Sequence, residues 1–184
     1  MLTNFKKEFG NIAPIGYIMR DSGINCIRIH NFPNKRYPED IKDNKQLLQF
    51  YKKLLNELCQ NTNLTCYINF YDLGIHDLEN TWLDKLDLKF LDNININPTE
   101  NEPYFVKTYL CKINNDSNDF EKMILDIANE EFDGSVTFYC NYKHNLILIS
   151  PYPGGVDIFI KRNILYDDIK KKLLSDGVDI KECP

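Results

Sequence analysis

Three cationic side chains and a histidine lie close together near the N-terminus, and their types suit the binding of an anion. Arg28 and His30 are two residues apart in a β-like run, so both side chains are expected on one face of a strand. Lys35 and Arg36 follow in the loop that leaves this run. Guanidinium groups bind carboxylates and phosphates through paired hydrogen bonds. The spacing therefore predicts an anion site, and the alternative is the polar outer face of a hairpin at a sheet edge.

The second distinctive segment is Pro-Tyr-Pro-Gly-Gly-Val-Asp, residues 151–157. Its adjacent glycines predict a turn that requires positive φ. Their spacing is not that of a phosphate-binding loop, and no Lys-Ser or Lys-Thr pair follows. Asp157 lies between two apolar residues, so its side chain is expected to point away from their core face. We interpret Asp157 either as a functional acid or as a cap of the turn, and place it with Tyr152 among the candidate ligand residues.

The sequence has no motif that is typical of an enzyme or a metal site. It has no G-x-S-x-G, H-E-x-x-H or G-x-G-x-x-G pattern, and no C-x-x-C pair. We therefore predict no catalytic residue, no metal and no cofactor. The N-terminal residues lack the apolar stretch of a signal peptide, and no run of about 20 apolar residues occurs. We expect a cytoplasmic protein that does not enter membranes, with its six cysteines as reduced thiols.

Charge is distributed unevenly along the chain, whose net charge is −5. Residues 1–53 carry ten basic and five acidic residues, a net charge of +5, whereas residues 72–102 carry eight acids against two lysines, a net charge of −6. The acidic segment predicts a surface for a basic protein partner, and the alternative is a solvated face. The overall acidity argues against nucleic-acid binding. The partner-binding candidates in this segment are Asp72, Asp77, Glu79, Asp84, Asp87 and Asp92.

The pattern of apolar residues predicts one α+β domain over residues 1–184, with a mainly antiparallel, meander-type sheet and helices packed on one face. Helices are expected around Phe5 and Phe9 and over residues 44–59, 120–128 and 165–174. Strands are expected over residues 64–71, 104–112, 136–141, 146–150 and 156–160. Residues 16–20 and 24–30 flank Asp-Ser-Gly, which predicts an N-terminal hairpin. The acidic segment 72–102 is expected to form a helix and a loop.

Two stretches resemble a family of small bacterial proteins that carry a domain of unknown function. The first, GYIMRDSGINCIRIHNFPNKRYPED, resembles the family's Ile-Arg-x-His…Lys-Arg-Tyr opening. The second, DFEKMILDIANEEF followed by LILISPYPGGVDIF, resembles its closing helix and Pro-Tyr-x-Gly-Gly-x-Asp segment. The resemblance covers residues 14–60 and 103–174, leaves the acidic middle out, and implies no activity. Members of the family more often carry Asp at the position of Pro153.

These observations lead to two functional hypotheses from different classes. The first is a non-enzymatic protein-binding module, of the kind that neutralises a toxin as an immunity protein does, acting through the acidic segment. The alternative is a small-ligand or anion-binding protein, or an unrecognised hydrolase, that uses Arg28, His30, Arg36 and Asp157. A pocket that collects these four residues favours the alternative.

Overall fold

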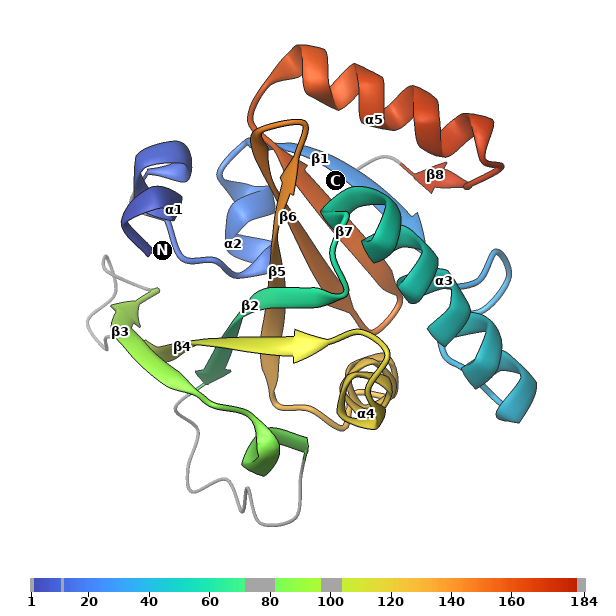
Figure 1. The fold of residues 1–184 in the computed structure, drawn as a ribbon, viewed down its shortest axis with the longest axis horizontal. Helices are drawn as coiled ribbons and strands as arrows, with labels where there is room; N and C mark the ends of the chain where they lie inside the picture. The colour runs from blue at the N-terminus through green and yellow to red at the C-terminus, as the bar shows by residue number, and fades with distance from the viewer. Residues whose placement is uncertain (1, 11, 72–81, 97–103, 182–184) are drawn as a thin grey trace.

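One antiparallel sheet of eight strands organises the chain in the computed structural model, which describes residues 2–10, 12–71, 82–96 and 104–181. The spatial order of the strands is β3-β4-β2-β5-β6-β7-β1-β8, so β5, β6 and β7 form the expected meander at its centre (Figure 1). The strands are β1 (Asn25–His30), β2 (Asn63–Tyr71), β3 (Lys89–Asn95), β4 (Phe105–Asn114), β5 (Gly134–Tyr142), β6 (Asn145–Tyr152), β7 (Gly155–Ile160) and β8 (Ile180–Lys181).

In the described part of the chain, five α-helices and one 3-10 helix accompany the sheet. They are α1 (Leu2–Phe9), α2 (Gly16–Asp21), α3 (Ile41–Cys59), η1 (Trp82–Lys85), α4 (Asn118–Ala128) and α5 (Asn163–Ser175). The chain is thus α+β, as the sequence predicts. Within the described ranges, no helix combines the length and the apolar character needed to cross a bilayer.

The three long helices pack on one face of the sheet and bury its largest apolar cluster. Along α3, within the predicted helix 44–59, a stripe of apolar residues is buried, which includes Leu47, Tyr51, Leu55 and Leu58. The stripe faces alternate residues of the strands, among them Ile27 and Ile29 of β1. The helix begins where the Asp40 side chain accepts a hydrogen bond from the backbone N–H of Asp43. Because Ile27 and Ile29 face this core, the prediction that Arg28 and His30 face the other way is confirmed for Arg28, whose carboxylate partner lies on the opposite face.

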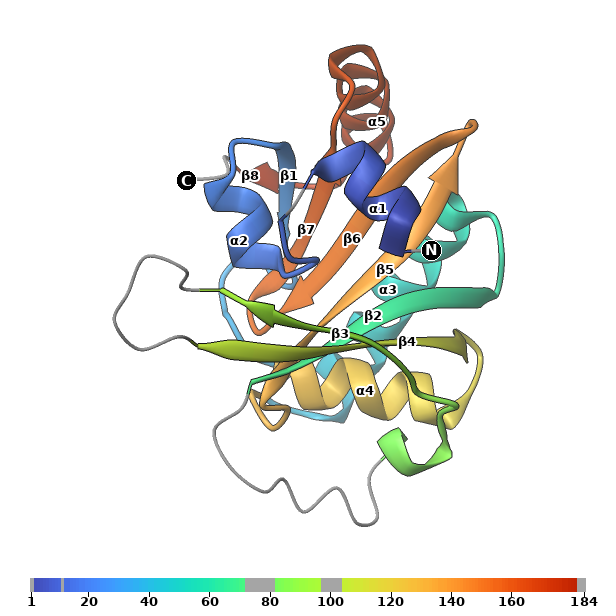
Figure 2. The same cartoon turned by 90° about the vertical axis from the view of Figure 1, so that its left-hand side faces the viewer.

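The two short N-terminal helices cover the other face, as Figure 2 shows. The N-terminal hairpin predicted from the sequence is therefore wrong, because residues 16–21 form α2. Tertiary contacts explain this. The Pro14 carbonyl accepts hydrogen bonds from Asn69 Nδ2 and Thr137 Oγ1 on the sheet. Gly16 lies so close to the sheet that a Cβ there would approach Ser150 Oγ to 2.8 Å. These contacts hold the start of α2 against the sheet. The helix has only six residues, too few for a helical period to be recognised in the sequence.

The acidic segment differs in part from its prediction as helix plus loop. Residues 72–81 and 97–103 lie outside the described residues. The described part begins with one turn of 3-10 helix, η1, in which Trp82 is buried and donates through Nε1 to Asp126 at 3.0 Å. Residues 89–95 then form the edge strand β3 instead of a helix or loop, paired with β4 and irregular between Phe90 and Asp92. That irregularity breaks the two-residue period by which a strand is recognised.

The cysteines also differ from expectation. Cys59, at the end of α3, is bonded to Cys140 of β5, and Cys26 is disulfide-bonded as well. Cys66 and Cys111 remain free, as directly paired residues of β2 and β4 with their sulfurs 3.2 Å apart. Their hydrogen bond, with burial, raises the pKa of Cys66. The prediction of six reduced thiols is wrong. Cys59 and Cys140 are 81 residues apart in sequence, and their spacing gives no sign that the fold brings them into contact. Disulfides persist mainly in oxidising compartments, so the cytoplasmic assignment stays a prediction.

Candidate functional site

A buried carboxylate lies at the centre of the candidate site. Asp157, on β7, is 2% exposed and points away from the main core, as predicted. Its Oδ1 accepts from Arg28 Nε at 2.8 Å, and its Oδ2 accepts from Arg28 Nη2 at 2.7 Å. Arg20 of α2 donates from Nη1 to the same Oδ2 at 3.2 Å. Strand pairing places Arg28 beside Asp157, because the two are directly opposite residues of β1 and β7.

This arrangement leaves positive charge at the site. One carboxylate serves two guanidinium groups, and hydrogen bonds to it raise the pKa of Arg28. The other acid near Arg20 is Asp21, which is 3.9 Å from Nε and 72% exposed, so solvent screens its charge. The Asp157 contacts use two of the five N–H donors of Arg28. Asp157 therefore orients two arginines without cancelling their combined charge.

Five of the six ligand residues predicted from the sequence line one hollow of about 510 Å³, which we call the basic hollow. Arg28 and His30 come from β1, and the loop after β1 contributes Lys35 and Arg36. Tyr152 closes the hollow, with its ring centroid 4.8 Å from Arg28 Cζ. None of the nine described lining residues is acidic. The structure thus brings together the residues of the predicted anion site.

The loop cations are held by acids that do not line the basic hollow. Lys35 donates to Asp43 at the start of α3, and this hydrogen bond lowers the pKa of Asp43. Arg36 donates from Nη2 to Glu130 at 3.2 Å, an ion pair whose side chains are 60% and 51% exposed. Such an exposed pair contributes about 0–1 kcal/mol. An incoming anion therefore competes for Arg36 at little cost.

The turn between β6 and β7 forms the wall behind the basic hollow. We predicted that its glycines require positive φ, but neither Gly154 nor Gly155 is among the positive-φ glycines of the described chain. The need at Gly155 is close approach instead, because a Cβ there would lie 2.1 Å from the Ile29 carbonyl oxygen of β1. This contact places Tyr152 beside Arg28. The Tyr152 hydroxyl is buried and has no hydrogen-bond partner among the described residues.

A second hollow, of about 270 Å³, lies on the other side of Tyr152, and we call it the polar hollow. Its lining includes Tyr17 and Arg20 of α2, Ser135 of β5, and both Tyr152 and Asp157. Tyr17, Arg20 and Ser135 are not among the site residues predicted from the sequence. Tyr17 and Arg20 were assigned to a strand, and a strand does not place them over β7. Ser135 carried no signal, because a serine at the start of a strand is common.

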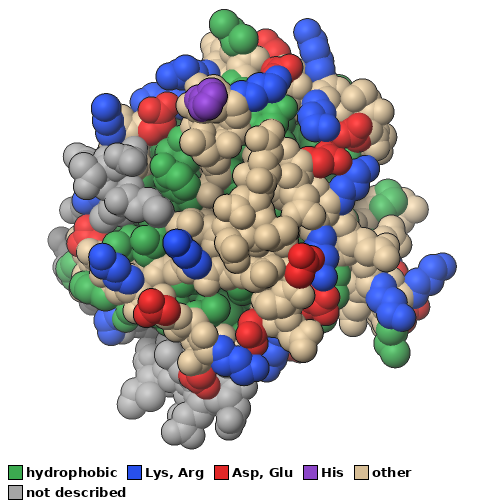
Figure 3. Space-filling view, viewed as in Figure 1, with side chains coloured by type: hydrophobic (Ala, Val, Ile, Leu, Met, Phe, Trp, Pro, Cys, Tyr) green, Lys and Arg blue, Asp and Glu red, His purple; other side chains and the backbone are tan. Residues whose placement is uncertain are grey.

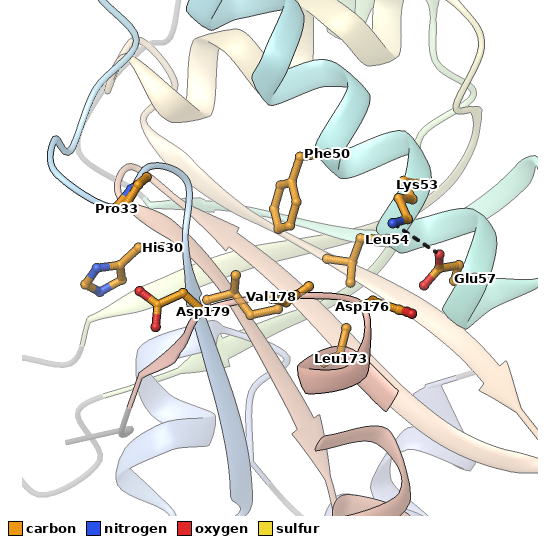
Figure 4. Close-up of a pocket in the computed structure, with 12 residues that line it drawn as sticks. His30, Pro33, Phe50, Lys53, Leu54, Glu57, Leu173, Asp176, Val178 and Asp179 are labelled. Carbon is orange, nitrogen blue, oxygen red and sulfur yellow. Dashed lines mark ion pairs between the residues drawn. The ribbon is translucent and has the colours of Figure 1, made fainter. Parts of the chain in front are cut away.

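A third hollow, of about 320 Å³, lies between α3, α5 and the segment before β8 (Figure 4). Its floor is apolar, with Phe50 and Leu54 of α3 facing Leu173 and Val178. The carboxylates on its rim have lysine partners: Glu57 pairs with Lys53 and Lys172, Asp176 with Lys172, and Asp179 with Lys181. The third hollow is thus an apolar depression with a charge-balanced rim.

The acidic segment is only partly described. Asp72, Asp77 and Glu79 lie outside the described residues. Asp84 and Asp87 are exposed, and Asp92 forms an ion pair with Lys6 of α1 at 3.3 Å. On the face shown in Figure 3, acidic and basic side chains are interspersed. The role of the six acids in binding a partner stays a prediction. Among the described residues, no three His, Cys, Asp or Glu side chains form a group suited to a metal ion.

Comparison with known proteins gives a family and no characterised relative. No curated protein and no solved structure matches the chain. The family described as Domain of unknown function (DUF3885) matches residues 15–175, which include every described residue of the basic and polar hollows. The family resemblance inferred from the opening and closing motifs is thereby confirmed, and the match extends across the acidic middle. The chain belongs to the Domain of unknown function (DUF3885) family.

Proposed function

We propose that the protein binds a small anionic ligand through a phosphate group in the basic hollow. The observation that carries this proposal is the convergence of Arg28, Lys35 and Arg36 on one hollow with no acid among its described lining residues. This is the alternative of the two functions predicted from the sequence. We favour it over the protein-binding module because Arg28, His30 and Arg36 line one hollow, while Asp157, the fourth residue of that prediction, lies outside the hollow and is hydrogen-bonded to Arg28.

The phosphate class follows from the geometry of the donors. Arg28 is fixed by Asp157 through two hydrogen bonds and is 15% exposed, so its remaining donors are held in place before a ligand arrives. Arg36 is 60% exposed and Lys35 is 31% exposed, so both side chains are accessible from solvent. Three cations around one hollow suit a doubly charged phosphate better than a singly charged carboxylate.

Isothermal titration with inorganic phosphate at low ionic strength tests this function. We expect saturable binding that weakens as salt is raised, because dissolved ions screen the attraction between phosphate and the solvent-exposed cations. Arg36→Gln is the informative variant, since Arg36 is 60% exposed and the substitution removes an exposed ion pair with Glu130 and a cation–π contact with Tyr37, so we expect the fold to be retained. We expect it to weaken phosphate binding about tenfold, which corresponds to about 1.4 kcal/mol.

A matched control separates the site from net charge. Arg162 is exposed at the start of α5 and lines neither the basic nor the polar hollow. Arg162→Gln changes the net charge by the same amount, and we expect it to leave phosphate binding within twofold of wild type. Equal losses in both variants would mean that phosphate binds through the overall field, and no binding at low salt would refute the proposed function.

A further inference from the structure

The basic hollow and the polar hollow lie side by side and share a wall. Tyr152 lines both, and Pro153 and Gly154 of the same turn line one each. Beneath this turn, Asp157 links Arg28 of the basic hollow to Arg20 of the polar hollow through hydrogen bonds of 2.7–3.2 Å. One polar cluster therefore supports both hollows.

The polar hollow has a different chemical character from the basic one. Besides Arg20 and Asp157, two residues that carry hydroxyl groups, Tyr17 and Ser135, line it. Ser135 is held by Asn69, which donates from Nδ2 to Ser135 Oγ at 3.2 Å and is itself fully buried. Hydroxyl, guanidinium and carboxylate groups in one hollow offer both donors and acceptors to a neutral polar ligand.

Aromatic rings form much of the remaining lining. Tyr17, Tyr71, Phe132 and Tyr152 all contribute to the polar hollow. Tyr17 is 40% exposed, so part of its ring is available to a ligand. Rings of this kind stack on planar heterocycles with little dependence on the identity of the heterocycle. The lining therefore suits a flat ring that carries hydrogen-bonding groups.

We propose that the anion is the phosphate of a nucleotide-like ligand, whose planar ring occupies the polar hollow while its phosphate occupies the basic hollow. This inference rests on the proposed function and extends it from an anion to a class of organic phosphate. Tyr17 stacks on the ring, and Ser135 and Arg20 hydrogen-bond to its polar edge. The ligand crosses the shared wall over Tyr152.

Titration of the full chain with inorganic phosphate, ribose 5-phosphate and the four common ribonucleoside 5′-monophosphates tests the inference. We expect at least one nucleotide to bind ten times or more tightly than inorganic phosphate, because stacking of one base contributes about a tenfold gain or more. Ribose 5-phosphate is expected to bind like inorganic phosphate. A sugar phosphate that equals the best nucleotide would overturn the assignment of a planar ring.

Two variants in the polar hollow complete the test. Tyr17→Ala and Ser135→Ala are expected to lower nucleotide affinity by five- to tenfold and to leave phosphate affinity unchanged. Tyr17→Phe keeps the ring and the fold, so it should retain most of the nucleotide affinity. Nucleotides that bind no tighter than phosphate would refute this inference and leave the proposed function standing. Absence of phosphate binding by the wild-type chain would refute the proposed function.

Discussion

Replacing Asp157 by asparagine removes the charge that holds two arginines in place. The carboxylate accepts three hydrogen bonds from guanidinium groups, and an asparagine offers one acceptor oxygen at the same position. Oδ2 accepts two of the three bonds, so an asparagine oxygen in its place loses the bond from Arg28 Nε, and the two remaining bonds lose their charge assistance. A charge-assisted hydrogen bond contributes about 1.5–3 kcal/mol, roughly twice as much as a neutral one. Arg28 and Arg20 are 15% and 24% exposed, so water partly solvates them in the variant. The summed loss is about 3–6 kcal/mol, and because of this solvation we expect Asp157→Asn to lower the free energy of unfolding by about 3 kcal/mol, the lower end of the sum.

Urea unfolding followed by tryptophan fluorescence measures this change. Trp82 is the only tryptophan and is buried, so its emission reports on global unfolding. The matched control is Asp21→Asn, which removes an exposed carboxylate 3.9 Å from Arg20 and should cost less than about 0.5 kcal/mol. If Asp157→Asn were as stable as this control, the buried cluster would not hold the site together.

The same variant separates charge from orientation in phosphate binding. Asp157→Asn makes the site more positive by one charge, so a mechanism based on charge alone predicts tighter binding. We expect weaker binding instead, because Arg28 is no longer held by two parallel hydrogen bonds. Tighter phosphate binding by the variant would refute the orienting role of Asp157.

Three further predictions follow from buried groups. Tyr152→Phe should leave the free energy of unfolding unchanged or raise it, because the Tyr152 hydroxyl has no described hydrogen-bond partner. Tyr51→Phe should lower the free energy of unfolding by about 1 kcal/mol, because it removes the 2.8 Å hydrogen bond to the Gly155 carbonyl. Urea unfolding of both variants checks this pair of expectations. The double variant Cys59→Ala/Cys140→Ala should lower the free energy of unfolding by about 4 kcal/mol, because the disulfide closes a loop with a sequence separation of 81 and so restricts the unfolded chain. A decrease below about 1 kcal/mol in urea unfolding would contradict this restriction. Burial raises the pKa of Tyr71 to about 12 from the ordinary 10.0, so Tyr71 ionises at lower pH in the unfolded chain than in the folded one. The contribution of this pKa difference to the free energy of unfolding is complete below pH 10 and should disappear between pH 10 and 12. Urea unfolding across that range, compared with the Tyr71→Phe variant, tests this.

The elements that the sequence predicted well are those whose own pattern specifies them. The apolar periodicity of α3 and of α4 is a local signal, and both helices form where expected. The meander from β5 to β7 follows from alternating residues and short turns. By contrast, α2 has six residues and no side-chain cap, and its conformation depends on contacts with β6. An element of that length carries too little periodicity to outweigh its tertiary contacts.

The candidate site divides along the same line. Arg28, His30, Lys35 and Arg36 were found because they are close in sequence, and Tyr152 and Asp157 because their segment is distinctive. Their meeting was not predictable, since it depends on β1 pairing with β7 across more than a hundred residues. Arg20 was missed because its role requires α2 to be a helix that lies over β7. Sequence patterns therefore identified one hollow and missed its neighbour.

The charge of the whole chain is a poor guide to this site. A net charge of −5 argues against anionic ligands if charge is averaged over the surface. However, the four cations of the site, Arg20, Arg28, Lys35 and Arg36, all come from the first 53 residues, where the net charge is +5. The acids that hold them, Asp157, Asp43 and Glu130, do not line the basic hollow. Because the described lining holds cations and the acids paired with them lie outside it, an acidic protein can present a basic hollow.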